Sequence, residues 1–185
     1  MPRRSILTAT ERENLFGWPE AQAELIRHYT LSATDLAIIR QHRGAMNRLG
    51  YAVQLCSMRH PGVALGTREK PFFPLLEIVA AQLKVPVERW SEYGQRGETR
   101  REHALELQTI FGFKAFTMRH YREGVRSLED VAWQTDKGIV LAAALVDEYR
   151  RQQVLLPTLS NIERICAEAV TRANRRIYAA RLWCK

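Results

Sequence analysis

The segment from Ser32 to Met58 has the sequence SATDLAIIRQHRGAMNRLGYAVQLCSM and carries the clearest indication of the chain's architecture. Its first four residues, Ser-Ala-Thr-Asp, have the form of a capping box and predict a helix over Asp35–Gln41. The turn His42-Arg43-Gly44 follows, and apolar residues at helical spacing then predict a second helix over Ala45–Met58. Two helices joined by a short glycine-containing turn resemble a helix-turn-helix, in which the second helix enters the major groove of DNA.

The same helical spacing continues on both sides of this hairpin, whereas strand-like alternation is almost absent. Further helices or turns are predicted at Thr8–Leu15 (capped by Thr8 or Thr10), Pro19–His28, Leu75–Leu83, Val87–Trp90, Glu98–Ile110, Met118–Glu123 (capped by Thr117), Leu128–Thr135 (capped by Ser127), Gly138–Gln153 and Asn161–Leu182. The sequence therefore predicts an all-α fold of two packed helical subdomains. We expect DNA-binding subdomains at residues 1–92 and 93–185, with a hinge in Ser91–Gly97.

Composition favours a polyanionic partner. The 185 residues carry a formal net charge of +8 with a pI of about 9.8, and 46% of them are hydrophobic, so a folded basic protein is expected. The simpler alternative is a basic soluble protein without a nucleic-acid partner. Cys56, Cys166 and Cys184 are too scattered for a disulfide framework or a zinc cluster, which predicts a reducing cytoplasm. No apolar run is long enough to span a membrane, and the basic start lacks the apolar stretch of a secretory signal.

The second helix of the hairpin supplies the first candidate contacts. Its apolar positions fall on one side, so the opposite side is expected to display polar residues that read base edges, as Asn and Gln do for adenine and Arg for guanine. The candidates in and before this helix are Arg40, Arg43, Asn47, Arg48, Tyr51 and Gln54. The alternative is an ordinary amphipathic helix with a solvated polar face.

Two further arginine clusters are candidates for phosphate contacts, since backbone amides at helix starts and neighbouring guanidinium groups bind phosphate. The residues of the middle cluster are Arg96, Arg100, Arg101, Lys114, Arg119 and Arg122, and those of the last helix are Arg172 and Arg175. In the middle cluster, pairing of Arg100 and Arg101 with nearby glutamates is the alternative. On the last helix, Arg164, Thr171 and Arg175 lie opposite the apolar stripe, but Glu168 shares that face, so a solvated helix is the alternative there.

The sequence gives little sign of catalysis. Arg119-His120-Tyr121-Arg122 has the residue types of a tyrosine recombinase site, but adjacent helix positions point in different directions. Nucleotide-binding glycine loops and the HExxH and GxSxG motifs are absent from the sequence. We therefore expect no enzyme activity, no cofactor and no bound metal in this chain.

Several blocks together resemble a known family. PRRSILTATER, LIRHYTLSATDLAIIRQHRGAMNRLGYAVQLC, PLLEIVAAQLKV, EYGQRGETRREHALELQTIFGF, QTDKGIVLAAAL and AEAVTRANRRIY are similar, in order, to the amino-terminal region of Tn-three family transposases, which move replicative bacterial transposons. The resemblance implies a part of a longer protein whose distal RNase H-like core carries an Asp-Asp-Glu triad. It also implies binding of the terminal inverted repeats by the amino-terminal region.

The expected function is thus sequence-specific binding of double-stranded DNA at transposon inverted repeats. The resemblance implies further partners, namely the remainder of the transposase and a second copy in a dimer of the full-length protein, in the bacterial cytoplasm at the nucleoid. The alternative is an assembly module of the transposase with only non-specific affinity for DNA.

Overall fold

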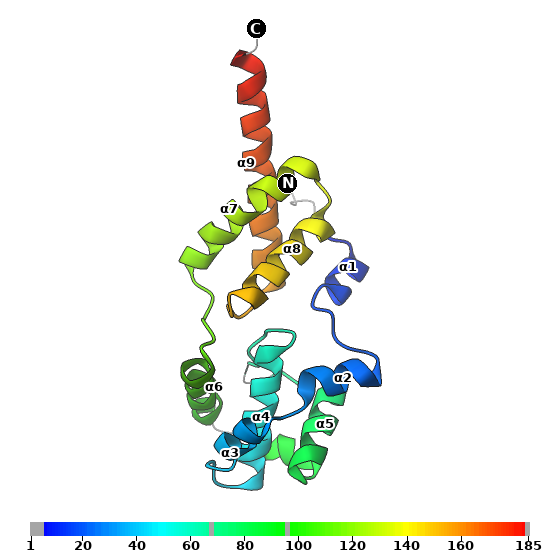
Figure 1. Cartoon of the computed structure of the whole chain (residues 1–185), viewed down its shortest axis with the longest axis vertical. Coiled ribbons are helices and arrows are strands. Elements are labelled where there is room, and N and C mark those ends of the chain that lie inside the picture. The colour runs from blue at the N-terminus through cyan, green and yellow to red at the C-terminus, as the bar shows by residue number, and fades with distance from the viewer. Residues whose placement is uncertain (1–5, 67–68, 95–96, 184–185) are drawn as a thin grey trace. The chain divides into compact units, whose positions relative to one another are not determined.

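The computed structural model describes residues 6–66, 69–94 and 97–183 (Figure 1). These residues form α-helices and one 3₁₀ helix, with no β-strand among them, and the predicted all-α class is confirmed. The elements are α1 (Ala9–Asn14), α2 (Gln22–Tyr29), α3 (Ala33–Ile39), α4 (Ala45–Arg59), α5 (Phe73–Leu83), η1 (Val87–Glu92), α6 (Gly97–Phe111), α7 (Met118–Gln134), α8 (Gly138–Arg151) and α9 (Leu159–Trp183).

The chain folds as two compact units that differ from the predicted halves. One unit, called here the α4 unit, is Trp18–Lys114; the other, the α9 unit, combines Met1–Gly17 with Ala115–Lys185. The predicted boundary after residue 92 falls inside the α4 unit because the adjacent Tyr93 is buried there. Its hydroxyl contacts Gln54 of α4 and lies 3.0 Å from His103 Nδ1 of α6, so the segments on both sides of the predicted hinge pack together.

Helix α4 is the central element of its unit. It packs against α2, α3, α5, α6 and η1, and every residue from Leu49 to Met58 is buried. The expected pattern of one core face and one solvated face is therefore wrong for α4, because both faces are buried from Leu49 to Met58 and Ala45, expected in the core, is exposed. Helices α3 and α4 follow one another and are in contact, but the helix expected to read DNA is enclosed by other helices, and the helix-turn-helix stays a prediction.

An ion pair fastens α3 to the end of α4. The Asp35 carboxylate accepts hydrogen bonds of 2.7 and 2.8 Å from the two terminal nitrogens of Arg59 and one of 2.9 Å from the Ser32 backbone N–H. Ser32 completes the predicted capping box by accepting from the Asp35 backbone N–H. Burial alone raises the pKa of Asp35, but the hydrogen bonds from Arg59 and Ser32 outweigh it and lower that pKa to about 2.

This lowered pKa predicts an acid-sensitive contribution to stability. Because the pKa of Asp35 falls from 3.8 to about 2 on folding, its stabilisation is complete above pH 5 and is lost as pH falls towards 2. The difference in unfolding free energy between the wild type and Asp35→Asn is expected to shrink by about 2 kcal/mol from pH 5 to pH 2. Urea unfolding followed by circular dichroism measures it, and a difference independent of pH contradicts the assignment.

In the α9 unit, α7 and α8 pack against the long helix α9 (Figure 1). Helix α7 is continuous, so the prediction of two helices separated near Gly124 is wrong. Glycine is needed there for close packing, because a Cβ atom would lie 2.4 Å from the hydroxyl of Tyr149 on α8. Ser127 is consequently not a cap, and its hydroxyl donates to the Gly124 carbonyl at 3.0 Å within the helix.

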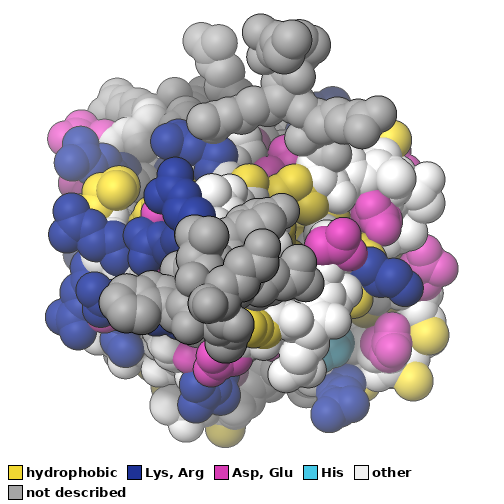
Figure 2. Space-filling model, turned by 90° about the horizontal axis from the view of Figure 1, so that it is seen from above, with side chains coloured by type: hydrophobic (Ala, Val, Ile, Leu, Met, Phe, Trp, Pro, Cys, Tyr) yellow, Lys and Arg dark blue, Asp and Glu magenta, His cyan; other side chains and the backbone are white. Residues whose placement is uncertain are grey.

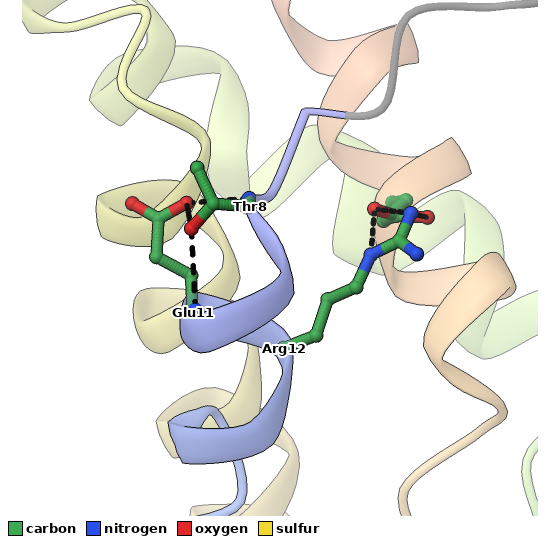
Figure 3. Close-up of polar contacts among 4 residues, drawn as sticks. Thr8, Glu11 and Arg12 are labelled. Carbon is green, nitrogen blue, oxygen red and sulfur yellow. Dashed lines mark hydrogen bonds and ion pairs between the residues drawn. The ribbon is translucent and has the colours of Figure 1, made fainter.

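Helix α1 is held on the same unit by polar contacts (Figure 3). Thr8 caps it as predicted, with Glu11 completing a capping box. Arg12 extends from α1 towards α9 and donates hydrogen bonds of 2.9 to 3.2 Å to both carboxylate oxygens of Glu163. A bidentate pair of this kind fixes orientation as well as distance. The start of the described chain therefore borders the exposed side of α9.

Candidate nucleic-acid interface

A groove of about 850 Å³ lies along the exposed side of α9, bordered by α1 and α7. We call it the α9 groove and define it by Arg12, Tyr121, Arg164, Glu168, Arg172 and Arg175. Four of these six side chains are arginines. The other two are Tyr121 and Glu168, which are hydrogen-bonded to each other, and Glu168 also accepts a hydrogen bond from Arg172. The groove is therefore basic and polar, which suits an anionic ligand better than an apolar one.

Helical spacing places the middle residues of the groove on one face of α9. Thr171 and Arg175 follow Arg164 by seven and eleven residues, close to two and three full turns. At 1.5 Å per residue, the two arginines start about 16 Å apart along the helix axis. The residues between them on this face include Ala167 and Thr171, which are small and exposed, so a ligand can approach the helix closely.

A hydrogen-bonded network crosses the groove from α7 to α9. The Tyr121 hydroxyl donates to Glu168 at 2.9 Å, and Arg172 donates to the other oxygen of the same carboxylate at 2.7 Å. Glu129 of α7, whose side chain is 14% exposed, pairs with Arg172 at 3.4 Å and with Arg176 at 2.9 Å. The hydrogen bonds from Tyr121 and Arg172 outweigh burial and lower the pKa of Glu168, so its carboxylate is ionised at neutral pH.

The other two α9 arginines of the groove differ from Arg172 in their contacts. Within the ranges that the structure describes, neither Arg164 nor Arg175 forms an ion pair or a hydrogen bond, and both are exposed. Their guanidinium groups carry five donors each and present them to the groove's surroundings. Arg164 belongs to no predicted contact set, although its spacing from Arg175 was visible in the sequence.

The predicted base-reading set is only partly on the surface. Tyr51 and Gln54 are each 0% exposed, so the prediction that these two side chains lie on the surface is wrong. Gln54 donates to the Tyr93 hydroxyl and to the Arg100 carbonyl, and the Tyr51 hydroxyl lies 3.4 Å from Glu106. Helix α6 and η1 cover the polar side of α4, which is why these polar residues are interior.

The rest of that set lies around the turn before α4. Arg40, Arg43 and Arg48 are exposed. Asn47 is half-buried, and one of the two N–H donors of its side-chain amide is bound to the Arg43 carbonyl at 3.0 Å.

The middle cluster divides between the two units. Arg96 lies outside the described residues. Arg100 is half-buried, donates to the Tyr93 and Gly66 carbonyls at 3.1 Å each, and stacks over Trp90 at 5.0 Å. It therefore links the segments around Gly66 and Tyr93 of the α4 unit. Arg101 and Lys114 are exposed in the α4 unit.

Arg119 and Arg122 belong to α7 of the α9 unit and are exposed. Arg119 donates to Glu123 at 2.8 Å in an exposed pair, the kind that contributes little to stability. The fold thus brings Arg172 and Arg175 together with Arg12 and Arg164 in one groove. The hairpin arginines belong to the other unit.

Lysine and arginine side chains are unevenly distributed on the face shown in Figure 2. Dark-blue side chains gather on one side of the view, while acidic side chains are more frequent on the other. By sequence, the α9 unit carries 15 basic and 10 acidic residues and the α4 unit 13 and 10, so the larger excess, +5 against +3, belongs to the α9 unit.

The groups of the described residues that resemble catalytic ones are poorly suited to nucleophilic chemistry. Burial, and then the hydrogen bond to Glu168, raise the pKa of Tyr121. Burial also raises the pKa of the Cys56 and Cys166 thiols to about 12, so they are protonated at neutral pH. No group of three or more metal-ligating side chains occurs in the described residues, and none of the helices described is long and apolar enough to cross a membrane.

Comparison with known proteins identifies the family. Residues 6–169 match the family described as a domain of unknown function, DUF4158. The chain is 68% and 64% identical over 180 residues to the transposases for transposons Tn3926 and Tn21 of Escherichia coli. It is 49% identical over the same length to the transposase for transposon Tn501 of Pseudomonas aeruginosa. Each match covers 97% of this chain but only 18% of the relative, so the chain spans about a fifth of the length of these proteins. The resemblance seen in the sequence is confirmed, and the chain belongs to the DUF4158 family, the amino-terminal domain of Tn-three family transposases.

Proposed function

We propose that this chain binds double-stranded DNA at the terminal inverted repeats of its transposon, as a non-catalytic part of a transposase. The observation that carries the proposal is the pair Arg164 and Arg175, exposed on one face of α9 without an ion pair among the described residues. Cutting and joining of DNA belong, in this proposal, to the part of the transposase outside this chain.

The dimensions of α9 support a duplex as the ligand. The major groove of B-DNA is about 12 Å wide and admits one α-helix, and Arg is the side chain that most often reads guanine there. Arg164 and Arg175 start about 16 Å apart, which corresponds to about five base pairs along a duplex at 3.4 Å per pair. Arg12 and Arg172 are held in place by carboxylates and border this face, where the phosphates of either strand would pass.

The α4 unit supplies a second set of contacts in this proposal. Arg40, Arg43 and Arg48 are exposed around one turn, and Arg101 and Lys114 are exposed elsewhere on the same unit. These side chains suit phosphates rather than bases, because the polar side of α4 beyond its first turn is enclosed. Two linked modules of modest affinity bind a long site more tightly than either alone.

The proposal predicts sequence preference with strong salt dependence. In fluorescence anisotropy, the 185-residue chain is expected to bind a duplex carrying an end of transposon Tn3926 at least about 100-fold more tightly than a scrambled duplex. Because phosphate contacts release counterions, both affinities should fall steeply between about 50 and 200 mM salt. Equal affinity for the two duplexes contradicts the proposal and favours the assembly module with non-specific affinity.

A further inference from the structure

Glu168 is the unexpected member of the α9 groove. The groove's other carboxylate, Glu163, is 17% exposed and paired with Arg12, whereas the Glu168 side chain is 35% exposed, and an exposed carboxylate repels the phosphates that the arginines attract. A glutamate on a merely solvated helix face has no need of fixed partners. Glu168 has two, Tyr121 from α7 and Arg172 one turn along α9, so its position is set by both helices.

The two hydrogen bonds leave acceptor capacity on the carboxylate. Each oxygen already accepts one hydrogen bond, but an ionised carboxylate has about four lone-pair sites, so further donors can be bound. In the major groove, cytosine N4 and adenine N6 carry amino donors, whereas guanine O6 and N7 and thymine O4 are acceptors. A fixed carboxylate therefore attracts the first kind of base edge and repels the second.

Glu168 also stands where base edges pass if α9 enters a major groove. It follows Arg164 by one turn and precedes Arg175 by two, and both of those arginines lie on the same exposed face. Arg172, which pairs with it, is additionally held by Glu129. The carboxylate is thus positioned independently of any ligand, which is the condition for discriminating between bases rather than adapting to them.

We propose that Glu168 is a specificity-determining residue that accepts a hydrogen bond from the amino group of a cytosine or adenine in the bound duplex. This inference rests on the proposed function, since it requires α9 to face DNA. It adds that the groove selects an amino-bearing base at the position opposite Glu168 and disfavours carbonyl-bearing bases and phosphates there. Non-specific DNA, which offers such acceptors in most registers, is held less tightly as a result.

The test combines Glu168→Gln with a scan of the DNA. Each base pair of a duplex from an end of Tn3926 is replaced in turn, with C·G changed to T·A and A·T to G·C, so that an amino donor becomes a carbonyl acceptor. With the wild type, one or two positions are expected to show an approximately tenfold rise in Kd that shrinks to under about twofold with Glu168→Gln. A glutamine loses this discrimination because its amide both donates and accepts.

Glu123→Gln is the matched control. It removes one negative charge from the same unit, from an exposed carboxylate on α7 that pairs with Arg119 and does not line the groove. Its scan is expected to match the wild-type scan at every position. Tyr121→Phe keeps the carboxylate but removes one of its two partners, so it is expected to reduce the penalty at the same positions without abolishing it.

The outcomes separate the inference from the function on which it rests. If the wild type prefers the transposon end but the scans of wild type and Glu168→Gln are parallel, Glu168 only holds Arg172 and the inference fails. The inference also fails if Glu168→Gln weakens the binding of all duplexes equally. If Glu168→Gln does not fold, a Tyr121→Phe scan identical to the wild type overturns the inference. A wild type without preference for the transposon end overturns the proposed function itself.

Discussion

Gly50→Ala is expected to destabilise the α4 unit by about 3 kcal/mol, although alanine is the better helix former. Gly50 lies inside α4, and a Cβ atom there would come within 2.2 Å of ring carbons of Tyr93. The ring has little room to move, because Tyr93 is 1% exposed and its hydroxyl contacts Gln54 and His103. Either the ring shifts and these buried contacts are lost, or α4 separates from η1.

The sign of the effect makes this prediction decisive. Helix propensity alone would stabilise Gly50→Ala by up to about 1 kcal/mol, so steric conflict and propensity predict opposite results. Gly66→Ala is the control, since its Cβ atom would meet only the exposed Glu69 carboxylate at 3.3 Å. Urea unfolding followed by circular dichroism measures both variants. An unchanged or increased stability of Gly50→Ala contradicts the packing of Tyr93 against α4.

Features that depend on neighbouring residues were predictable from the sequence. The capping boxes at Thr8 and Ser32 join residues three positions apart, so the sequence contains both partners of each hydrogen bond. The positions of most helices follow from the same local signals together with apolar spacing. The all-α class could therefore be predicted without knowledge of any long-range contact.

Features that depend on distant partners were not predictable. Gln54 is a suitable base-reading side chain until Tyr93, 39 residues later, is known to lie against it. Gly124 has the local signature of a helix end, and only the hydroxyl of Tyr149 explains why a glycine is required inside α7. In both cases the role of the residue depends on packing against a distant tyrosine, and the spacing of residues in the sequence does not indicate such a contact.

The candidate groove likewise combines features that were predictable from the sequence with contacts that were not. Arg172 and Arg175 were predicted because arginine is abundant on α9, and the exposed spacing of Arg164 was visible as well. The sequence does not indicate which arginines are already paired, since Arg12 meets Glu163 across 151 residues. Charge becomes informative for binding only when the fold shows which guanidinium groups have internal carboxylate partners.

The largest expected effect on binding is that of Arg164→Glu/Arg175→Glu. This double variant changes the charge of the α9 groove by −4 and adds two carboxylates to the exposed face of α9. Affinity for the Tn3926 end is expected to fall at least about 100-fold, because two attractive contacts become repulsive ones. The fold should be unaffected, since within the described residues neither arginine forms an ion pair or a hydrogen bond that would be lost.

Arg126→Glu/Lys137→Glu is the matched control, with the same charge change at exposed positions of the same unit outside the groove. Its general electrostatic effect is expected to weaken binding only several-fold and to be screened at about 150 mM salt.

Anisotropy titrations at several salt concentrations also distinguish phosphate contacts from base contacts of the groove arginines. If Arg164 and Arg175 contact phosphates, the salt slope falls by about 2 and the affinities for the transposon end and for scrambled DNA fall together. If they read guanines, the preference for the transposon end is lost while the slope changes little. Equal weakening by the groove variant and the control would mean that net charge alone accounts for binding and that the α9 groove is not the interface.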